Sequence, residues 1–145
     1  MLYTKMTKQA LRIAFDAHKK QVDKSGLPYI FHPFHLAEQM SDEVSVCVAL
    51  LHDVIEDTPV TFDDLAAQGI SEAVIKALRL LTHDDNVPYM EYVQRIKESG
   101  NQTAIAVKMA DLRHNMDVSR LDSVDEKINK LLSKYRKAIE ILEGC

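Results

Sequence analysis

The most apolar stretch of the chain lies at positions 44–51, and a compact group of ionisable side chains follows it. The stretch contains no charged residue, and Ala and Leu dominate its end. Because no turn residue interrupts this pattern, it predicts a buried helix. We expect this helix to begin at a cap, Ser41 or Asp42, and to end near Thr58.

Apolar positions recur with helical spacing along most of the remaining chain, and no segment shows the alternation of a strand. Capping residues, Gly and Pro separate these segments. The expected helices cover residues 7–20, 33–40, 61–69, 71–81, 88–100, 101–115 and 124–142. The pattern therefore predicts an all-α fold of about seven or eight helices, packed around the central helix at 44–57.

Composition agrees with one globular domain. The chain has 145 residues, of which 46% are hydrophobic and 28% charged, with 4 Gly and 4 Pro. This length is sufficient for one sizeable core, and no repeat or linker-like segment divides it, so we expect residues 1–145 to form a single domain. The formal net charge of −4 argues against sequence-independent binding to nucleic acid, which requires a basic surface.

Cysteine usage and hydropathy indicate where the protein resides. Cys47 lies within the apolar stretch and Cys145 is the last residue, so both are predicted to be free thiols. The chain shows no apolar run typical of a signal peptide or of a membrane span. These features predict a cytoplasmic protein that does not bind a membrane.

The first candidate chemistry lies at the end of the central helix, where His52, Asp53, Glu56 and Asp57 occur within six positions. On a continuous helix, His52 lies above Glu56 and Asp53 lies above Asp57, on one shared face. Burying unpaired charges costs several kcal/mol per ion, and the helix dipole disfavours carboxylates at this end. We therefore expect a divalent metal ion to compensate the charge, the alternative being a solvated helix end.

Other expected elements supply further candidates for the same ion. Lys108, Asp111 and Asn115 share one face of the helix at 101–115, so Asp111 is a plausible second carboxylate, unless this face is an exposed salt-bridging one. His32, just before Pro33, could add a second imidazole. A set of two His and two Asp suits Mn²⁺, Fe²⁺ or Zn²⁺ better than a structural thiolate site does.

Three phrases of the sequence carry these candidates. They are Ser-Gly-Leu-Pro-Tyr-Ile-Phe-His-Pro at 25–33, Ala-Leu-Leu-His-Asp-Val-Ile-Glu-Asp-Thr at 49–58 and Val-Lys-Met-Ala-Asp-Leu-Arg-His-Asn-Met at 107–116. Their order of His, His-Asp and Asp resembles the signature of the HD-domain metal-dependent phosphohydrolases. More narrowly, the phrases resemble the hydrolase domain of the RelA/SpoT homologues, over roughly residues 17–135. This resemblance implies an HD-domain helical bundle that removes the 3′-pyrophosphate of (p)ppGpp, here as a small stand-alone hydrolase.

The resemblance also implies a role for individual residues and a small-molecule nucleotide as the substrate. The implied ligands of the metal, usually Mn²⁺, are His32, His52, Asp53 and Asp111. The implied catalytic pair is Glu56 and Asp57. The implied contacts to the nucleotide are Lys24, Ser25, Asn115 and Tyr135.

Two positions depart from the pattern of the alarmone hydrolases. Those enzymes have an Arg that stacks on guanine where this chain has Asp23, which offers neither a guanidinium plane nor a cation. Their Asp-Arg-Leu-His-Asn is here Asp-Leu-Arg-His-Asn, which moves the Arg to position 113, about 100° around the helix and off the site-facing side. These departures leave open an HD phosphohydrolase of another nucleotide or nucleoside phosphate and, further, a non-catalytic nucleotide-binding module.

Overall fold

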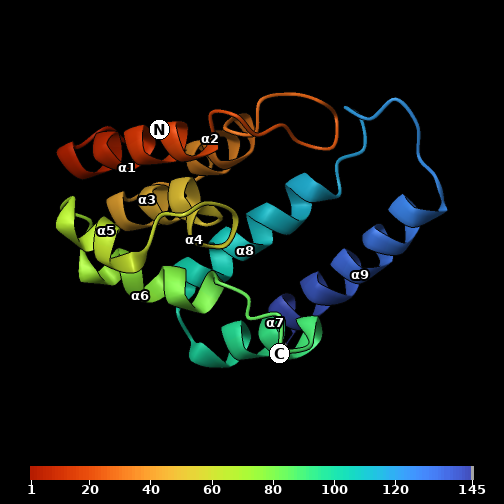
Figure 1. Cartoon of the computed structure of the whole chain (residues 1–145). Coiled ribbons are helices and arrows are strands. Elements are labelled where there is room, and N and C mark those ends of the chain that lie inside the picture. The colour runs from red at the N-terminus through yellow and green to blue at the C-terminus, as the bar shows by residue number, and fades with distance from the viewer. Residues whose placement is uncertain (145) are drawn as a thin grey trace.

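Nine α-helices make up the regular structure of residues 1–144, the part of the chain that this computed structural model describes (Figure 1). They are α1 (Lys5–His18), α2 (Phe31–Glu38), α3 (Glu43–Leu51), α4 (Val54–Asp57), α5 (Phe62–Ala67), α6 (Glu72–Leu81), α7 (Tyr89–Ser99), α8 (Gln102–Asn115) and α9 (Glu126–Glu143). Within the same residues, β-structure is limited to an isolated bridge between Val22 and Pro28. The predicted all-α fold is confirmed, while the single domain over 1–145 stays a prediction.

Side-chain caps begin most of the helices where the sequence predicts them. Asp42 accepts a hydrogen bond from the Ser45 N–H at 2.8 Å, and Thr61 and Asn101 accept equivalent bonds at α5 and α8. Each such cap typically contributes about 1 kcal/mol. Ser71 stands at the N-cap position of α6 without forming a side-chain bond, and α2, α4 and α7 also begin without one.

Helix α3 lies at the centre of the molecule, as predicted. Residues 45–51 are all buried, and the helix packs against α1, α2, α6 and α8. Burial of a Leu or Val side chain stabilises a fold by roughly 1.5–3 kcal/mol, so this helix anchors the core. Cys47 is a free, buried thiol within it, whereas Cys145 lies outside the described residues.

The predicted central helix does not continue to position 57. It ends at Leu51, and a separate turn, α4, begins after His52 and Asp53. The His52 ring bonds the Ala49 carbonyl oxygen, with Nδ1 at 2.7 Å, and Asp53 has φ −105° and ψ −1°. His52 keeps helical backbone angles, with φ −57° and ψ −30°, so the path departs at Asp53, and a wheel drawn through residues 44–57 misplaces the acids that follow.

Two connecting segments meet at one end of the molecule, namely residues 19–30 between α1 and α2 and residues 116–125 between α8 and α9 (Figure 1). An ion pair joins them, with Arg120 Nη1 3.0 Å from Asp23 Oδ2. None of the helices within residues 1–144 is long and apolar enough to cross a membrane.

Candidate functional site

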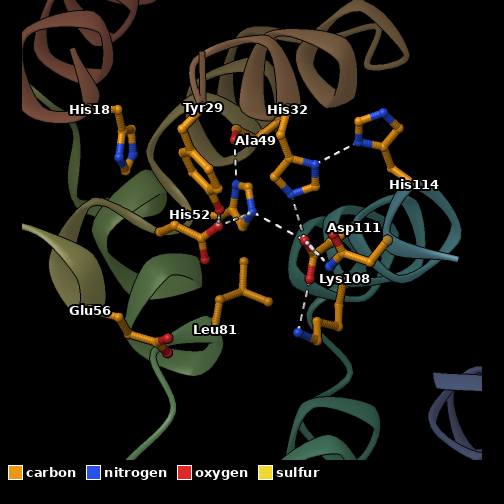
Figure 2. Close-up of polar contacts among 12 residues, drawn as sticks. His18, Tyr29, His32, Ala49, His52, Glu56, Leu81, Lys108, Asp111 and His114 are labelled. Atoms are coloured by element: carbon orange, nitrogen blue, oxygen red, sulfur yellow. Dashed lines mark hydrogen bonds and ion pairs between the residues drawn. The ribbon is translucent and has the colours of Figure 1, made fainter. Parts of the chain in front are cut away.

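The four predicted metal ligands converge on one point. His32 comes from α2, His52 and Asp53 from the break between α3 and α4, and Asp111 from α8. One ligand atom of each lies within 4.8 Å of the other three. Figure 2 shows His32, His52 and Asp111 turned toward one another. We call these four residues the metal cluster.

His52 shows that the cluster fits a cation. Its Nδ1 lies 2.7 Å from the Ala49 carbonyl oxygen and so donates a proton there, which leaves the lone pair on Nε2. Nε2 is buried and has no hydrogen-bond partner within the described residues, although it lies 2.9 Å from Asp53 Oδ2 and 3.3 Å from Asp111 Oδ1. A lone pair and two carboxylate oxygens that face one space without bonding each other are the donor set of a metal site.

The charges around His52 support the same conclusion. Burial alone would lower the pKa of His52, but the carboxylates of Asp53 and Asp111 outweigh burial and raise that pKa well above its usual value. The position therefore attracts positive charge. The cluster could hold a divalent metal ion through two imidazoles and two carboxylates.

His114 orients His32. The Nδ1 atoms of the two rings lie 2.6 Å apart, so one must donate a proton to the other. Burial, followed by the neighbouring His32, lowers the pKa of His114 to about 4, which leaves this ring neutral near pH 7 and able to accept. His32 then donates from Nδ1 and directs its Nε2, 2.8 Å from Asp111 Oδ1, toward the cluster.

The predicted face of α8 is confirmed. Lys108 Nζ lies 3.0 Å from Asp111 Oδ2, and Asn115 Nδ2 donates to Asp111 Oδ1 at 3.2 Å. Burial alone would raise the pKa of Asp111, but the Lys108 ammonium outweighs it and holds that pKa well below its usual range. Asp111 therefore remains a carboxylate. Arg113 is exposed and pairs with Glu143, so it lies away from the site as predicted.

Tyr29 joins the site without having been predicted to do so. Its hydroxyl donates to Asp53 Oδ2, and its ring centroid lies 4.8 Å from that of the buried His18. Gln21 then links His18 to α4, because its oxygen lies 2.8 Å from His18 Nδ1 and its amide donates to the Asp57 carbonyl oxygen at 2.9 Å. Its position within the phrase at 25–33, which also contains His32, is the sequence feature that could have identified Tyr29 as a site residue.

The two predicted catalytic acids lie in different surroundings. Glu56 accepts a hydrogen bond from the His83 backbone N–H and lines a cavity of about 80 Å³, together with His52, Asp53 and Lys108. Asp57 lines neither this cavity nor the larger one next to His32. Partial burial, with a contribution from Asp53, raises the pKa of both carboxyl groups. The expected continuous helix from His52 to Asp57 is wrong, because α3 ends at Leu51, and of the two acids only Glu56 lines a cavity with His52 and Asp53.

The larger cavity, of about 280 Å³, meets the cluster at His32. All four residues predicted to contact a nucleotide line it, namely Lys24, Ser25, Asn115 and Tyr135. Asp23 and Arg120 line it too, and Arg120 was not predicted, because residues 116–125 carry no helical pattern. The structure thus brings the predicted contacts together, and their role in binding stays a prediction.

Comparisons with known proteins agree with this arrangement. The chain is 37% identical to the bifunctional (p)ppGpp synthase/hydrolase SpoT of Escherichia coli over 124 residues, which are 77% of this chain and 18% of that protein. It is 29% identical to the guanosine-3′,5′-bis(diphosphate) 3′-pyrophosphohydrolase MESH1 of Xenopus tropicalis, over 94% of this chain and 82% of that protein. The chain thus spans about a fifth of the length of SpoT. No protein-family model matches the chain.

A solved structure shares the fold. It is described as a metazoan ortholog of SpoT that hydrolyzes ppGpp and plays a role in starvation responses. The TM-score is 0.80 with 23% sequence identity, over 99% of this chain and 89% of the other. The fold and the relatives together confirm the resemblance that the three sequence phrases predict, to the helical HD-type ppGpp hydrolases.

Proposed function

We propose that the protein hydrolyses the 3′-pyrophosphate of ppGpp, with GDP and pyrophosphate as products. The main support for this proposal is that the metal cluster lies between two cavities. His32 lines the larger cavity, and the other three cluster residues line the smaller one. One cavity is lined by the four predicted nucleotide contacts, and the other contains Glu56. The names of SpoT and MESH1 support the choice of ppGpp as substrate.

The proposed cofactor is Mn²⁺, held by His32, His52, Asp53 and Asp111. Two imidazoles and two carboxylates form a mixed nitrogen and oxygen set that suits this ion. A bound divalent ion would supply Lewis-acid chemistry, polarising a phosphoryl oxygen and lowering the pKa of water. The chain itself keeps the donors in place through the Ala49 carbonyl, His114 and Lys108.

Glu56 is the better placed of the two proposed catalytic acids. The His83 N–H holds its carboxylate in the small cavity beside Asp53, where partial burial raises its pKa. A carboxylate in this position takes a proton from the attacking water and returns one to the ribose 3′ oxygen as its bond to phosphorus breaks. Asp57, the second acid of the predicted catalytic pair, does not line that cavity.

Binding of the nucleotide is assigned to the larger cavity. Lys24 contributes an ammonium group for the phosphates, and Ser25, whose hydroxyl proton is donated to Asp23, offers an acceptor for a ribose hydroxyl. Asn115 and Tyr135 line the part contributed by α8 and α9. Burial, followed by Lys127 and Lys134, lowers the pKa of Lys24, so an anionic ligand would relieve repulsion among these cations. We propose a small-molecule nucleotide as the substrate and the cytoplasm as the location.

Product analysis tests the proposal. Purified protein is incubated with ppGpp and Mn²⁺, and GDP and pyrophosphate are followed, with EDTA in a parallel reaction. We expect both products in equal amounts and their loss with the chelator. Absence of turnover by folded, metal-loaded protein would contradict the assigned substrate.

A second candidate is hydrolysis of another nucleotide or nucleoside phosphate by the same cluster. The observation in its favour is Asp23, an anion in the wall of the larger cavity. A panel of pppGpp, dNTPs and nucleoside monophosphates, assayed beside ppGpp, separates the two candidates. A purely binding module is disfavoured because Glu56 lies in a cavity that reaches the cluster.

A further inference from the structure

The wall of the larger cavity contains an ion pair. Arg120 Nη1 lies 3.0 Å from Asp23 Oδ2, and the two side chains are 30% and 12% exposed. They come from the two connecting segments that meet beside the cavity, 97 residues apart in sequence. The cavity therefore extends from His32 of the cluster to an acid and a cation that neutralise each other.

Most of the accepting capacity of Asp23 is used within the protein. Its Oδ1 accepts hydrogen bonds from the Ser25 N–H at 2.8 Å, the Ser25 hydroxyl at 2.6 Å and the Leu27 N–H at 3.1 Å. Its Oδ2 accepts from Arg120. Burial alone would raise the pKa of Asp23, but these bonds outweigh it and lower that pKa. Asp23 therefore shapes the turn and holds Arg120 in position.

Several N–H groups of the Arg120 guanidinium form no hydrogen bond to the described residues. A guanidinium carries five N–H groups, and within the described residues only Nη1 forms a hydrogen bond. Its Nε is buried and has no partner there. The buried Nε is out of a ligand's reach, whereas the second N–H of Nη1 and both N–H groups of Nη2 form no bond to the described residues and can donate to a ligand in the cavity. The apolar side chains of Val22 and Leu121 line the same part of the cavity and suit the faces of a planar base.

The base edge that matches a guanidinium is that of guanine. O6 and N7 of guanine are adjacent acceptors, which Arg can bind with two hydrogen bonds, whereas adenine presents a donor in place of O6. We propose that Arg120, positioned by Asp23, selects guanine at the base end of the bound nucleotide. This inference rests on the proposed function and adds to it the residue that determines base specificity.

Binding of GDP and ADP to the Mn²⁺-loaded protein, measured by calorimetry, tests the inference without requiring turnover. We expect the wild-type protein to prefer GDP. Arg120→Ala should weaken GDP binding about tenfold or more and leave ADP binding within about twofold, so that the preference is lost. The matched control is Arg113→Ala, which removes an exposed Arg from an ion pair with Glu143 outside the cavity and should change neither affinity.

Arg120→Lys separates base recognition from a structural role. A lysine keeps the positive charge opposite Asp23, and hence the joined segments, but lacks the planar fork of donors. We expect GDP binding to be weakened nearly as much as in Arg120→Ala, with an unchanged melting temperature. If Lys restores the preference for GDP, Arg120 acts only through its ion pair and the inference is overturned.

The remaining outcomes separate this inference from the proposed function. Unchanged GDP binding in Arg120→Ala, or a wild type without a preference for GDP over ADP, overturns the inference even if ppGpp is hydrolysed. Selective loss of GDP binding supports it even if ppGpp is not a substrate. Where ppGpp is hydrolysed, the inference also requires Arg120→Ala to raise KM and to leave kcat within about threefold.

Discussion

The two ends of the larger cavity are built in different ways. At one end, the metal cluster is formed by α2, α8 and the break after α3, and its side chains are held by the Ala49 carbonyl, His114 and Lys108. At the other end, two connecting segments are joined by the single pair of Asp23 and Arg120. The first is part of the core, and the second lies at the surface.

This difference indicates which of the two regions tolerates amino-acid substitutions. A substitution in the cluster removes a buried candidate ligand whose partners are fixed by the core. A substitution in the connecting segments alters a partly exposed contact and leaves the core intact. With the proposed function, the fold separates the chemistry of the phosphate from recognition of the base, and four predictions test this separation.

Asp53→Ala should have the largest effect. It removes one ligand and also the acceptor of the Tyr29 hydroxyl. We expect bound metal to be lost and ppGpp turnover to fall to the level of protein kept in chelator, with the helix content by circular dichroism unchanged. Retention of stoichiometric metal in mass spectrometry would show that the cluster is not the metal site.

Glu56→Gln should lower kcat by roughly 10²–10⁴-fold while metal content is unchanged. The amide oxygen of Gln can still accept the His83 N–H, so the variant removes the ionisable group and keeps its position. The comparison is Asp57→Asn, for which we expect a smaller loss, because Asp57 lines neither cavity. An equal or larger loss in Asp57→Asn would reverse the assignment of the better-placed acid.

His114→Ala should weaken metal affinity by about 10–100-fold, the usual cost of removing a residue that orients a ligand. The variant removes the acceptor that fixes the His32 ring. A matched control is His35→Ala, since this exposed ring packs on His114 without bonding a cluster residue. Competition titration with a fluorescent chelator measures both variants, and equal affinities would refute the orienting role.

Lys24→Ala should have the smallest effect and should leave metal affinity unchanged. Loss of one charged hydrogen-bond donor to the nucleotide predicts a rise in KM of about tenfold. Lys24 is exposed and contributes to the cavity wall, not to the cluster. Steady-state kinetics at saturating Mn²⁺ measure the change, and a parallel loss of metal would show that the two ends are coupled.

Sequence patterns were sufficient for the features that depend on local periodicity. The central helix, the face shared by Lys108 and Asp111, and the caps at Asp42 and Asn101 each follow from spacings of three or four residues. The convergence of the four candidate ligands was also predictable, because a buried acid-rich helix end requires compensation and the three phrases supply partners. These predictions involve residues on helices that pack in the core.

The features that were missed depend on departures from periodicity or on distant contacts. The spacing predicted one continuous helix through residues 44–57, whereas α3 ends at Leu51 and α4 begins at Val54, so Glu56 and Asp57 were both assigned to the face of His52 and Asp53. Arg120 reaches Asp23 across 97 residues, through a segment without a repeating pattern. The spacing of apolar and polar residues along one segment predicts neither the partner of Arg120 nor the direction of the chain after a helix ends.

The break between α3 and α4 also makes the number of residues between Asp53 and Glu56 critical for the position of Glu56. α4 is a single turn, Val54–Asp57, that carries Glu56 into the small cavity. A one-residue shift there rotates all later side chains by about 100°. A deletion between Asp53 and Glu56 would put Asp57 in the position of Glu56, and an insertion would put Ile55 there. Libraries of length variants should therefore be depleted of function at these positions, even where substitutions of Ile55 are tolerated.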